Sequence, residues 1–144
     1  MLAELFARGH RGQIASAVCV RYERDLAYRS AHRLLQQRFT HYRYLTLTTR
    51  ERINIAPGTV GFVGKRYLQD YLDSGDLERD AGWRLSPSDT HVFLCGNPQM
   101  IGAGGGTDAP TPNRPPGMLQ ILRERGFAKD DKGIVGNVHF ERYW

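Results

Sequence analysis

The chain has 144 residues, of which 40% are hydrophobic and 24% are charged, so it has the length and composition of one globular domain with its own core. No apolar run approaches the ~20 residues of a membrane helix, which argues against a membrane protein. The net charge of +5 suits phosphorylated ligands or an acidic protein partner. The sequence has no long Lys/Arg run and no motif of a known nucleic-acid module, which argues against nucleic acid as a partner.

The cysteines and histidines indicate neither a disulfide nor a metal site. Cys19 and Cys95 lie far apart in apolar, strand-like segments, a pattern typical of reduced thiols in a cytoplasmic protein. The histidines have no metal-ligand spacing, so we expect no bound metal.

Helices and strands are predicted to alternate along the chain. In order, the patterns predict a helix at 1–7, a strand at 14–20 buried on both faces, a helix from Asp25 to about Phe39, a strand at 42–48, short helices at 67–72 and 76–80, a strand at 91–95, a helix at 118–125 and a strand at 137–142. Gly102 to Pro116 is rich in glycine and proline and predicts a loop, to which we assign no function. The alternation predicts an α/β fold with a parallel sheet.

Three polar segments follow predicted strands, and ligands of such sheets bind at the carboxyl ends of the strands. The segments are Arg21, Thr49–Arg50–Glu51 and Cys95–Gly96–Asn97–Pro98. Thr49 and Arg50 combine a hydroxyl with a guanidinium, which suits a phosphate monoester. Lys65, Arg66 and Tyr67 add charge and a ring for stacking on a base. The alternative is a solvated basic face, but for the group together we favour phosphate binding.

The residues at the later strand ends leave several interpretations open. Three interpretations of Cys95 are open. It could be a nucleophile, although the sequence shows no base paired with it; it could be a buried structural cysteine; or it could make a weakly polar contact beside a reacting carbon. Glu141 is an orienting or proton-relay group, or an exposed carboxylate. Tyr143 and Trp144 either cap the core or cover a flat ligand such as a flavin, and their residue types alone favour neither.

Four segments together resemble the C-terminal, NADP-binding half of bacterial ferredoxin–NADP(+) reductases. They are Val20–Arg21–Tyr22 with Asp25–Leu26–Ala27–Tyr28, Thr49–Arg50–Glu51, the stretch from Val92 to Ile101 that contains Cys-Gly-Asn-Pro, and the Glu141–Arg142–Tyr143–Trp144 terminus. The resemblance implies a Rossmann-like, three-layer parallel sheet and a cytoplasmic FAD flavoprotein that moves hydride between FAD and NADP(H).

The resemblance also implies a role for each matching residue. Arg21, Thr49 and Arg50 would bind the 2′-phosphate and adenosine end of NADP. Lys65, Arg66, Tyr67 and Gln69 would flank the adenine, with the tyrosine stacked on it. Cys95 would lie beside the nicotinamide, in a pocket lined by Gly96, Asn97, Pro98 and Met100. Glu141 would lie near the flavin, on which Tyr143 would stack, and Trp144 would extend towards the FAD adenine.

Two departures from the family pattern limit these expectations. The FAD-binding barrel is absent, and so are the first strand of the NADP-binding domain and its glycine-rich pyrophosphate loop. We therefore expect residues 1–144 to be a partial NADP-binding domain with neighbouring strands unpaired, inactive without the FAD domain. The parent protein would be a monomer that exchanges electrons with ferredoxin or flavodoxin. The alternatives are a non-catalytic nucleotide-binding fragment and a related flavin reductase that serves an oxygenase.

Overall fold

The computed structural model describes residues 2–102, 116–131 and 133–142. The chain forms two compact units, Met1–Arg66 and Tyr67–Trp144, and each contains one two-stranded parallel sheet. The predicted α/β class with parallel strands is confirmed.

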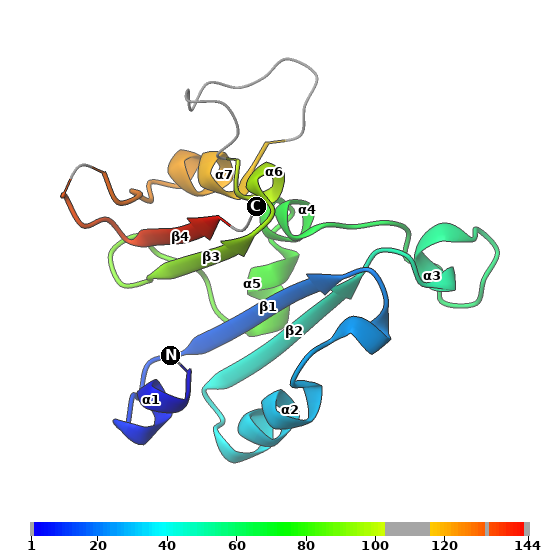
Figure 1. Ribbon diagram of the computed structural model, residues 1–144, viewed down its shortest axis with the longest axis horizontal. Coiled ribbons are helices and arrows are strands. Elements are labelled where there is room, and N and C mark those ends of the chain that lie inside the picture. The colour runs from blue at the N-terminus through cyan, green and yellow to red at the C-terminus, as the bar shows by residue number, and fades with distance from the viewer. Residues whose placement is uncertain (1, 103–115, 132, 143–144) are drawn as a thin grey trace. The chain divides into compact units, whose positions relative to one another are not determined.

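The first unit contains two parallel strands, one helix before them and short helices after each strand (Figure 1). Its elements are α1 (Leu2–Ala7), β1 (Ile14–Val20), the 3₁₀ helix η1 (Glu23–Asp25), α2 (Arg29–Arg38), β2 (Tyr42–Thr48) and α3 (Arg52–Ile55). The strands are in register from Ile14 opposite Tyr42 to Val20 opposite Thr48. This register places the residues after both strands at the same edge of the sheet.

An aromatic cluster forms the core of the first unit. Phe6 stacks on Phe39 with ring centroids 4.1 Å apart and meets Tyr42 edge-on at 5.6 Å. Tyr42 is fully buried, and its hydroxyl lies 2.6 Å from His32 Nδ1. Burial therefore lowers the pKa of His32 and raises that of Tyr42.

Two sequence predictions for the first unit are wrong. The helix does not begin at Asp25, because the Asp25 carboxylate accepts a hydrogen bond from the Tyr22 backbone at 3.1 Å and Tyr28 has a left-handed φ of 55°, which separates η1 from α2. Strand β1 is not buried on both faces, since all its residues are at least partly exposed.

The second unit contains α4 (Leu68–Asp73), α5 (Asp76–Ala81), β3 (Val92–Gly96), α6 (Pro98–Ile101), α7 (Met118–Glu124) and β4 (Val138–Arg142). Strands β3 and β4 are in register from Val92 opposite Val138 to Gly96 opposite Arg142. Helix α6 packs on both strands and on α7 (Figure 1). The buried side chains include Leu72, Leu94, Ile101, Met118, Ile121, Leu122 and Val138.

Two glycines of the second unit, Gly102 and Gly117, lie where two backbone segments are in contact. A Cβ on Gly117 would lie 2.2 Å from the Cα of Gly102, the first residue of the predicted loop, so position 117 has no room for a side chain. Among the described residues, no helix is long and apolar enough to cross a bilayer.

Candidate functional site

The carboxyl ends of β1 and β2 are tied to each other through the backbone. The Arg50 N–H donates to the Arg21 carbonyl at 2.8 Å, and the Thr49 N–H donates to the Val20 carbonyl at 3.1 Å. Parallel pairing thus continues one step beyond the strands and brings Arg21, Thr49 and Arg50 together, as the sequence predicted.

Two of these residues expose their side chains and one does not. Arg21 and Arg50 are exposed, so their guanidinium groups are available to an anion. Thr49 is 6% exposed, and its hydroxyl donates to the Val20 carbonyl at 3.3 Å. In this arrangement Thr49 holds the two strand ends together, and the two arginine side chains are exposed to solvent.

Glu51 and Asn54 support these loops, and sequence analysis gave neither a role. The Glu51 carboxylate accepts from the Glu23 backbone at 2.8 Å, which joins the loop after β1 to the loop after β2. Asn54 is buried at 5% exposure and makes hydrogen bonds with Thr48, Glu51 and Gly64. The sequence pointed to Glu51, which belongs to the Thr49–Arg50–Glu51 segment after the second predicted strand. It did not point to Asn54, which belongs to no motif.

The residues predicted to flank an adenine fall on both sides of the boundary between the units. Lys65 and Arg66 end the first unit, directly after Gly64, whose carbonyl Asn54 binds at 3.1 Å. Tyr67 precedes α4 in the second unit, and its backbone N–H donates to Asp70 at 2.9 Å. Gln69, on α4, has a buried Oε1 with no hydrogen-bond partner among the described residues, an acceptor that suits a ligand donor.

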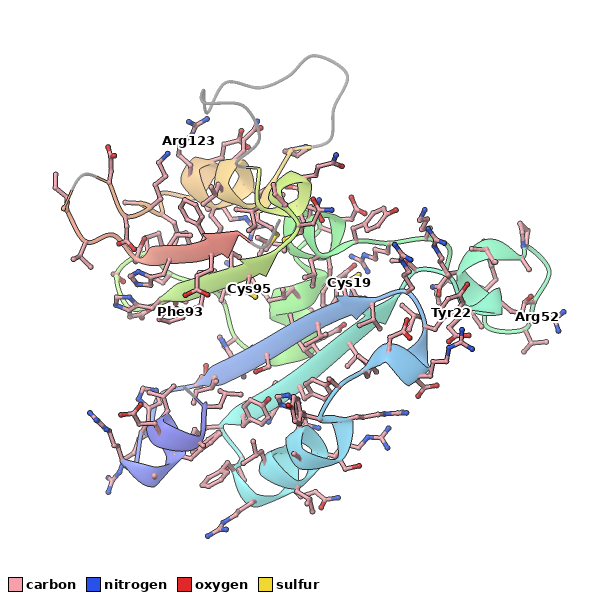
Figure 2. All side chains as sticks on the ribbon, viewed as in Figure 1. Cys19, Tyr22, Arg52, Phe93, Cys95 and Arg123 are labelled. Atoms are coloured by element: carbon pink, nitrogen blue, oxygen red, sulfur yellow. The ribbon has the colours of Figure 1, made fainter. Side chains whose placement is uncertain are left out.

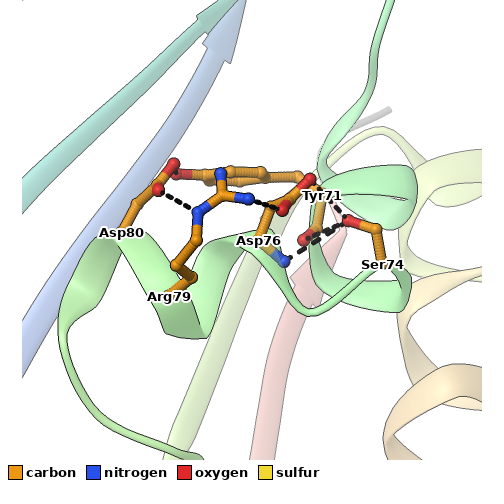
Figure 3. A network of polar contacts seen from close by, with 5 residues as sticks. All are labelled: Tyr71, Ser74, Asp76, Arg79 and Asp80. Carbon is orange, nitrogen blue, oxygen red and sulfur yellow. Dashed lines mark hydrogen bonds and ion pairs between the residues drawn. The ribbon is translucent and has the colours of Figure 1, made fainter.

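A polar network holds α4 against α5 (Figure 3). The Tyr71 hydroxyl donates to Asp80 at 2.7 Å, and Arg79 Nε donates to the other Asp80 oxygen at 2.9 Å. These hydrogen bonds, that from Tyr71 first, lower the pKa of the Asp80 carboxyl. Arg79 also pairs with Asp76. The network fixes the helix that carries Gln69.

Cys95 and Glu141 occupy opposing positions at the carboxyl ends of β3 and β4. Side chains paired in register lie on the same face of a sheet, so the structure brings these two predicted residues together. Cys95 is exposed, as is Phe93 on the same strand (Figure 2). The interpretation of Cys95 as a buried structural cysteine is therefore wrong.

The turn after β3 begins with a backbone conformation that favours glycine. Gly96 has a φ of +151°, which residues with a side chain rarely adopt, and a Cβ there would lie 2.9 Å from the methyl group at the end of the Met100 side chain. The Asn97 side chain accepts from the Gln99 backbone at 2.7 Å and caps α6, with Pro98 as its first residue. The local sequence thus explains the sharp turn. Tyr143 and Trp144 lie outside the described residues.

The histidines at the amino ends of β3 and β4 are used in hydrogen bonds. His139 Nδ1 lies 2.7 Å from the Asp130 carboxylate, and its Nε2 lies 3.2 Å from His91 Nδ1. The hydrogen bond from His139, and then that from the Gly136 backbone, lower the pKa of Asp130. Among the described residues, no three His, Cys, Asp or Glu side chains are grouped to hold a metal.

The second unit also has an open cavity of about 760 Å³, lined by Gly75, Glu78, Arg79, Gly82, Trp83, Arg84, Leu85 and Arg125. None of the residues predicted from the sequence lines it. Arg125 donates there to Glu78 at 2.9 Å and to the Leu72 carbonyl at 2.6 Å, so it serves the packing of α4, α5 and α7.

Comparison with known proteins identifies relatives. The chain is similar to the flavodoxin/ferredoxin–NADP reductase of Escherichia coli (strain K12), with 34% identity over 82 residues, 56% of this chain and 30% of the relative. The flavodoxin/ferredoxin–NADP reductase of Buchnera aphidicola subsp. Schizaphis graminum is 27% identical over 130 residues, 87% of this chain and 41% of that protein. The chain therefore spans less than half of these curated relatives.

A solved structure supports the same fold. The crystal structure of a ferredoxin NADP+ reductase from Neisseria gonorrhoeae with bound FAD and NADP superposes with a TM-score of 0.61 at 19% identity, over 96% of this chain and 59% of that one. This likeness shows the fold.

A family model settles the classification. The model of the oxidoreductase NAD-binding domain matches residues 1–104, which include both arginine-bearing strand ends and the turn after β3. The chain belongs to the family of oxidoreductase NAD-binding domains.

Proposed function

We propose that this chain is the NADP-binding part of a ferredoxin or flavodoxin–NADP(+) reductase. The observation that carries the proposal is the backbone hydrogen bond from Arg50 to Arg21, which keeps two exposed guanidinium groups on adjacent loops. A phosphate monoester carries about 1.5 to 2 negative charges near pH 7, and a pair of arginines matches that charge with directed N–H donors. The relatives named as NADP reductases support this choice of anion.

Residues of the first unit would bind the adenosine end of the nucleotide. Arg21 and Arg50 would bind the 2′-phosphate, and Thr49 would fix the distance between them through its hydrogen bonds to Val20. Lys65 and Arg66 would add positive charge on the same unit. In the second unit, Tyr67 would stack on the adenine and the buried Gln69 oxygen would accept from it.

Residues of the second unit would hold the nicotinamide end. Gly96, with Asn97, Pro98 and Met100, would form the floor on which a flat ring rests, because Gly96 has no side chain that would stand between its backbone and the ring. Bound NADP(H) supplies the hydride chemistry, in exchange with FAD. Cys95 would border the reacting ring with a small thiol, and Glu141, on the same face, would orient it.

The FAD and protein partners of the parent enzyme are proposed from the relatives. The Neisseria gonorrhoeae reductase has FAD bound, and here Tyr143 and Trp144 would cover that flavin. The relatives' names support ferredoxin or flavodoxin as the electron carrier, and the net charge of +5 suits an acidic carrier. A monomeric parent protein in the cytoplasm and a lack of nucleic-acid binding stay predictions.

A second candidate is a nucleotide-binding fragment without catalysis. It is favoured by the short length of the match, because the alignment covers only 30% of the Escherichia coli relative. One outcome separates the two candidates: a bound flavin with NADPH-dependent dye reduction by the purified chain excludes the fragment. A colourless, inactive chain fits both candidates, because the NADP-binding part is expected to be inactive without the FAD domain.

Titration calorimetry of the purified chain tests the nucleotide assignment. We expect NADP+ to bind at least tenfold more tightly than NAD+, since a charge-assisted contact to the extra phosphate is worth roughly a factor of ten or more. Equal affinities would refute NADP binding at the arginine pair.

A further inference from the structure

The buried amide of Asn54 links the loop after β2 to the segment that ends in Lys65 and Arg66. Asn54 lies on α3 and is 5% exposed. Its Oδ1 accepts from the Thr48 hydroxyl at 2.8 Å and from the Glu51 N–H at 3.1 Å, and its Nδ2 donates to the Gly64 carbonyl at 3.1 Å. The backbone donor of Glu51 and the backbone acceptor of Gly64 require this orientation of the amide.

The contacts of Asn54 reach each arginine loop in one or two steps. Through the Glu51 backbone, Asn54 fixes the residue that directly follows Arg50. The Glu51 carboxylate then accepts from the Glu23 N–H at 2.8 Å, two residues after Arg21. One amide therefore positions the loops after both strands, and these loops share the Arg50–Arg21 backbone bond of 2.8 Å.

The third contact reaches the segment that carries Lys65. Gly64 is held by the Asn54 amide and by its own N–H, which donates to the Ile53 carbonyl at 3.2 Å. The neighbouring Val63 N–H also donates to Ile53, at 2.9 Å. Lys65 thus follows a backbone position that is fixed relative to Arg50.

Like charges brought onto adjacent loops repel each other, so their backbones need a fixed support if they are to meet one anion. A buried side chain with all its hydrogen bonds made provides such a support, because any displacement leaves a buried group unpaired. Asn54 makes three such hydrogen bonds, with Thr48 and Glu51 at the end of β2 and with Gly64 in the later loop.

We propose that Asn54 is the positioning residue for recognition of the 2′-phosphate, and that it sets the preference for a 2′-phosphorylated nucleotide without touching the phosphate. This inference rests on the proposed function, because it concerns the same arginine site.

The test measures the dissociation constants of the purified chain for 2′-AMP and 5′-AMP by calorimetry. The readout is the dissociation constant for 5′-AMP divided by that for 2′-AMP. This ratio measures the preference for the 2′-phosphate, and a general loss of stability does not change it. In Asn54→Ala we expect this ratio to fall about tenfold, the effect of one or two lost hydrogen bonds. A ratio equal to that of the unmodified chain overturns the proposal.

Asn137→Ala is the matched control. Asn137 also bridges two segments, since its Oδ1 accepts from the Ala128 N–H at 2.8 Å and its Nδ2 donates to the Pro87 carbonyl at 2.7 Å. It belongs to the second unit, so its loss should lower stability but leave the ratio unchanged. An equal fall of the ratio in this control contradicts a specific role for Asn54.

Thr48→Val provides a milder variant if Asn54→Ala does not fold. It keeps the shape of the side chain and removes only the hydroxyl that donates to Asn54 at 2.8 Å. We expect a two- to fivefold fall in the ratio, about the effect of one weakened hydrogen bond, and an unchanged ratio overturns the proposal.

Arg50→Ala separates failure of the inference from failure of the proposed function. If Arg50→Ala lowers the ratio and Asn54→Ala does not, the arginine site stands and the positioning role of Asn54 is wrong. If the unmodified chain shows no preference for 2′-AMP, the phosphate site itself is refuted, and the inference with it.

Discussion

Removal of the Arg50 guanidinium tests phosphate recognition at the carboxyl ends of β1 and β2. Its side chain is exposed, and its backbone N–H keeps the 2.8 Å bond to the Arg21 carbonyl in Arg50→Ala. The substitution therefore removes a ligand group without removing a support, and we expect the free energy of unfolding to change by less than about 0.5 kcal/mol.

The expected cost to binding follows from the contact that is lost. A hydrogen bond to a charged group contributes about 1.5–3 kcal/mol, which corresponds to a roughly ten- to hundredfold weaker affinity for NADP+. NAD+ lacks the 2′-phosphate, so its affinity should change by no more than about twofold. Calorimetric titration of both nucleotides at low ionic strength measures the difference, because added salt screens exposed charges.

Arg33→Ala is the charge-matched control for this experiment. Arg33 is an exposed residue of α2 in the same unit, so its substitution changes the net charge equally. Binding of either nucleotide should stay within about twofold of the unmodified chain. Equal losses for NADP+ and NAD+ in Arg50→Ala would refute the reasoning, and so would an equal loss of NADP+ affinity in the control.

Three further predictions concern the second unit. Cys95 is exposed, so iodoacetamide should label it, and saturating NADP+ should slow the labelling as followed by mass spectrometry; an unchanged rate contradicts a nicotinamide pocket there. Gly117→Ala would place a Cβ 2.2 Å from the Cα of Gly102, which should lower the free energy of unfolding by about 1–3 kcal/mol in urea titrations; unchanged stability contradicts the close approach. Tyr71 and Arg79 lower the pKa of Asp80 from 3.8, so the stability from this carboxylate is present above that pH and is lost as the pH falls through the lower folded pKa. The difference in melting temperature between the chain and Asp80→Asn should therefore shrink below about pH 3.8, and a difference independent of pH contradicts the network.

The strands were predictable because their signal is local. Tyr42–Thr48 and Val92–Gly96 are rich in residues that favour extended backbone, and both form parallel pairs as expected. Helices α3 and α6 have only four residues each, too few to show an apolar period. The start of α2 was misjudged because Asp25 can cap a helix, whereas its carboxylate here closes a turn with Tyr22.

The position of the candidate site was predictable from the sequence, but the residues whose hydrogen bonds hold its loops were not. Parallel strands put their carboxyl ends at one edge, so the meeting of Arg21 with Arg50 followed from the predicted fold. The role of Asn54 did not, because its contact with Gly64 spans a loop of ten residues whose path no local pattern specifies. The exposure of Cys95 was also missed, since burial depends on what packs over a strand and its apolar neighbours suggested a core position.

The proposed NADP site lies at the carboxyl ends of the strands. Titration of the isotopically labelled chain with NADP+, followed through backbone amide resonances, tests it most directly. We predict saturable shifts at Arg21 and Arg50 in the first unit and at Gly96 in the second, with little change at Arg33 on α2. Shifts absent from the strand ends, or equal at Arg33, would contradict NADP binding at these strand ends.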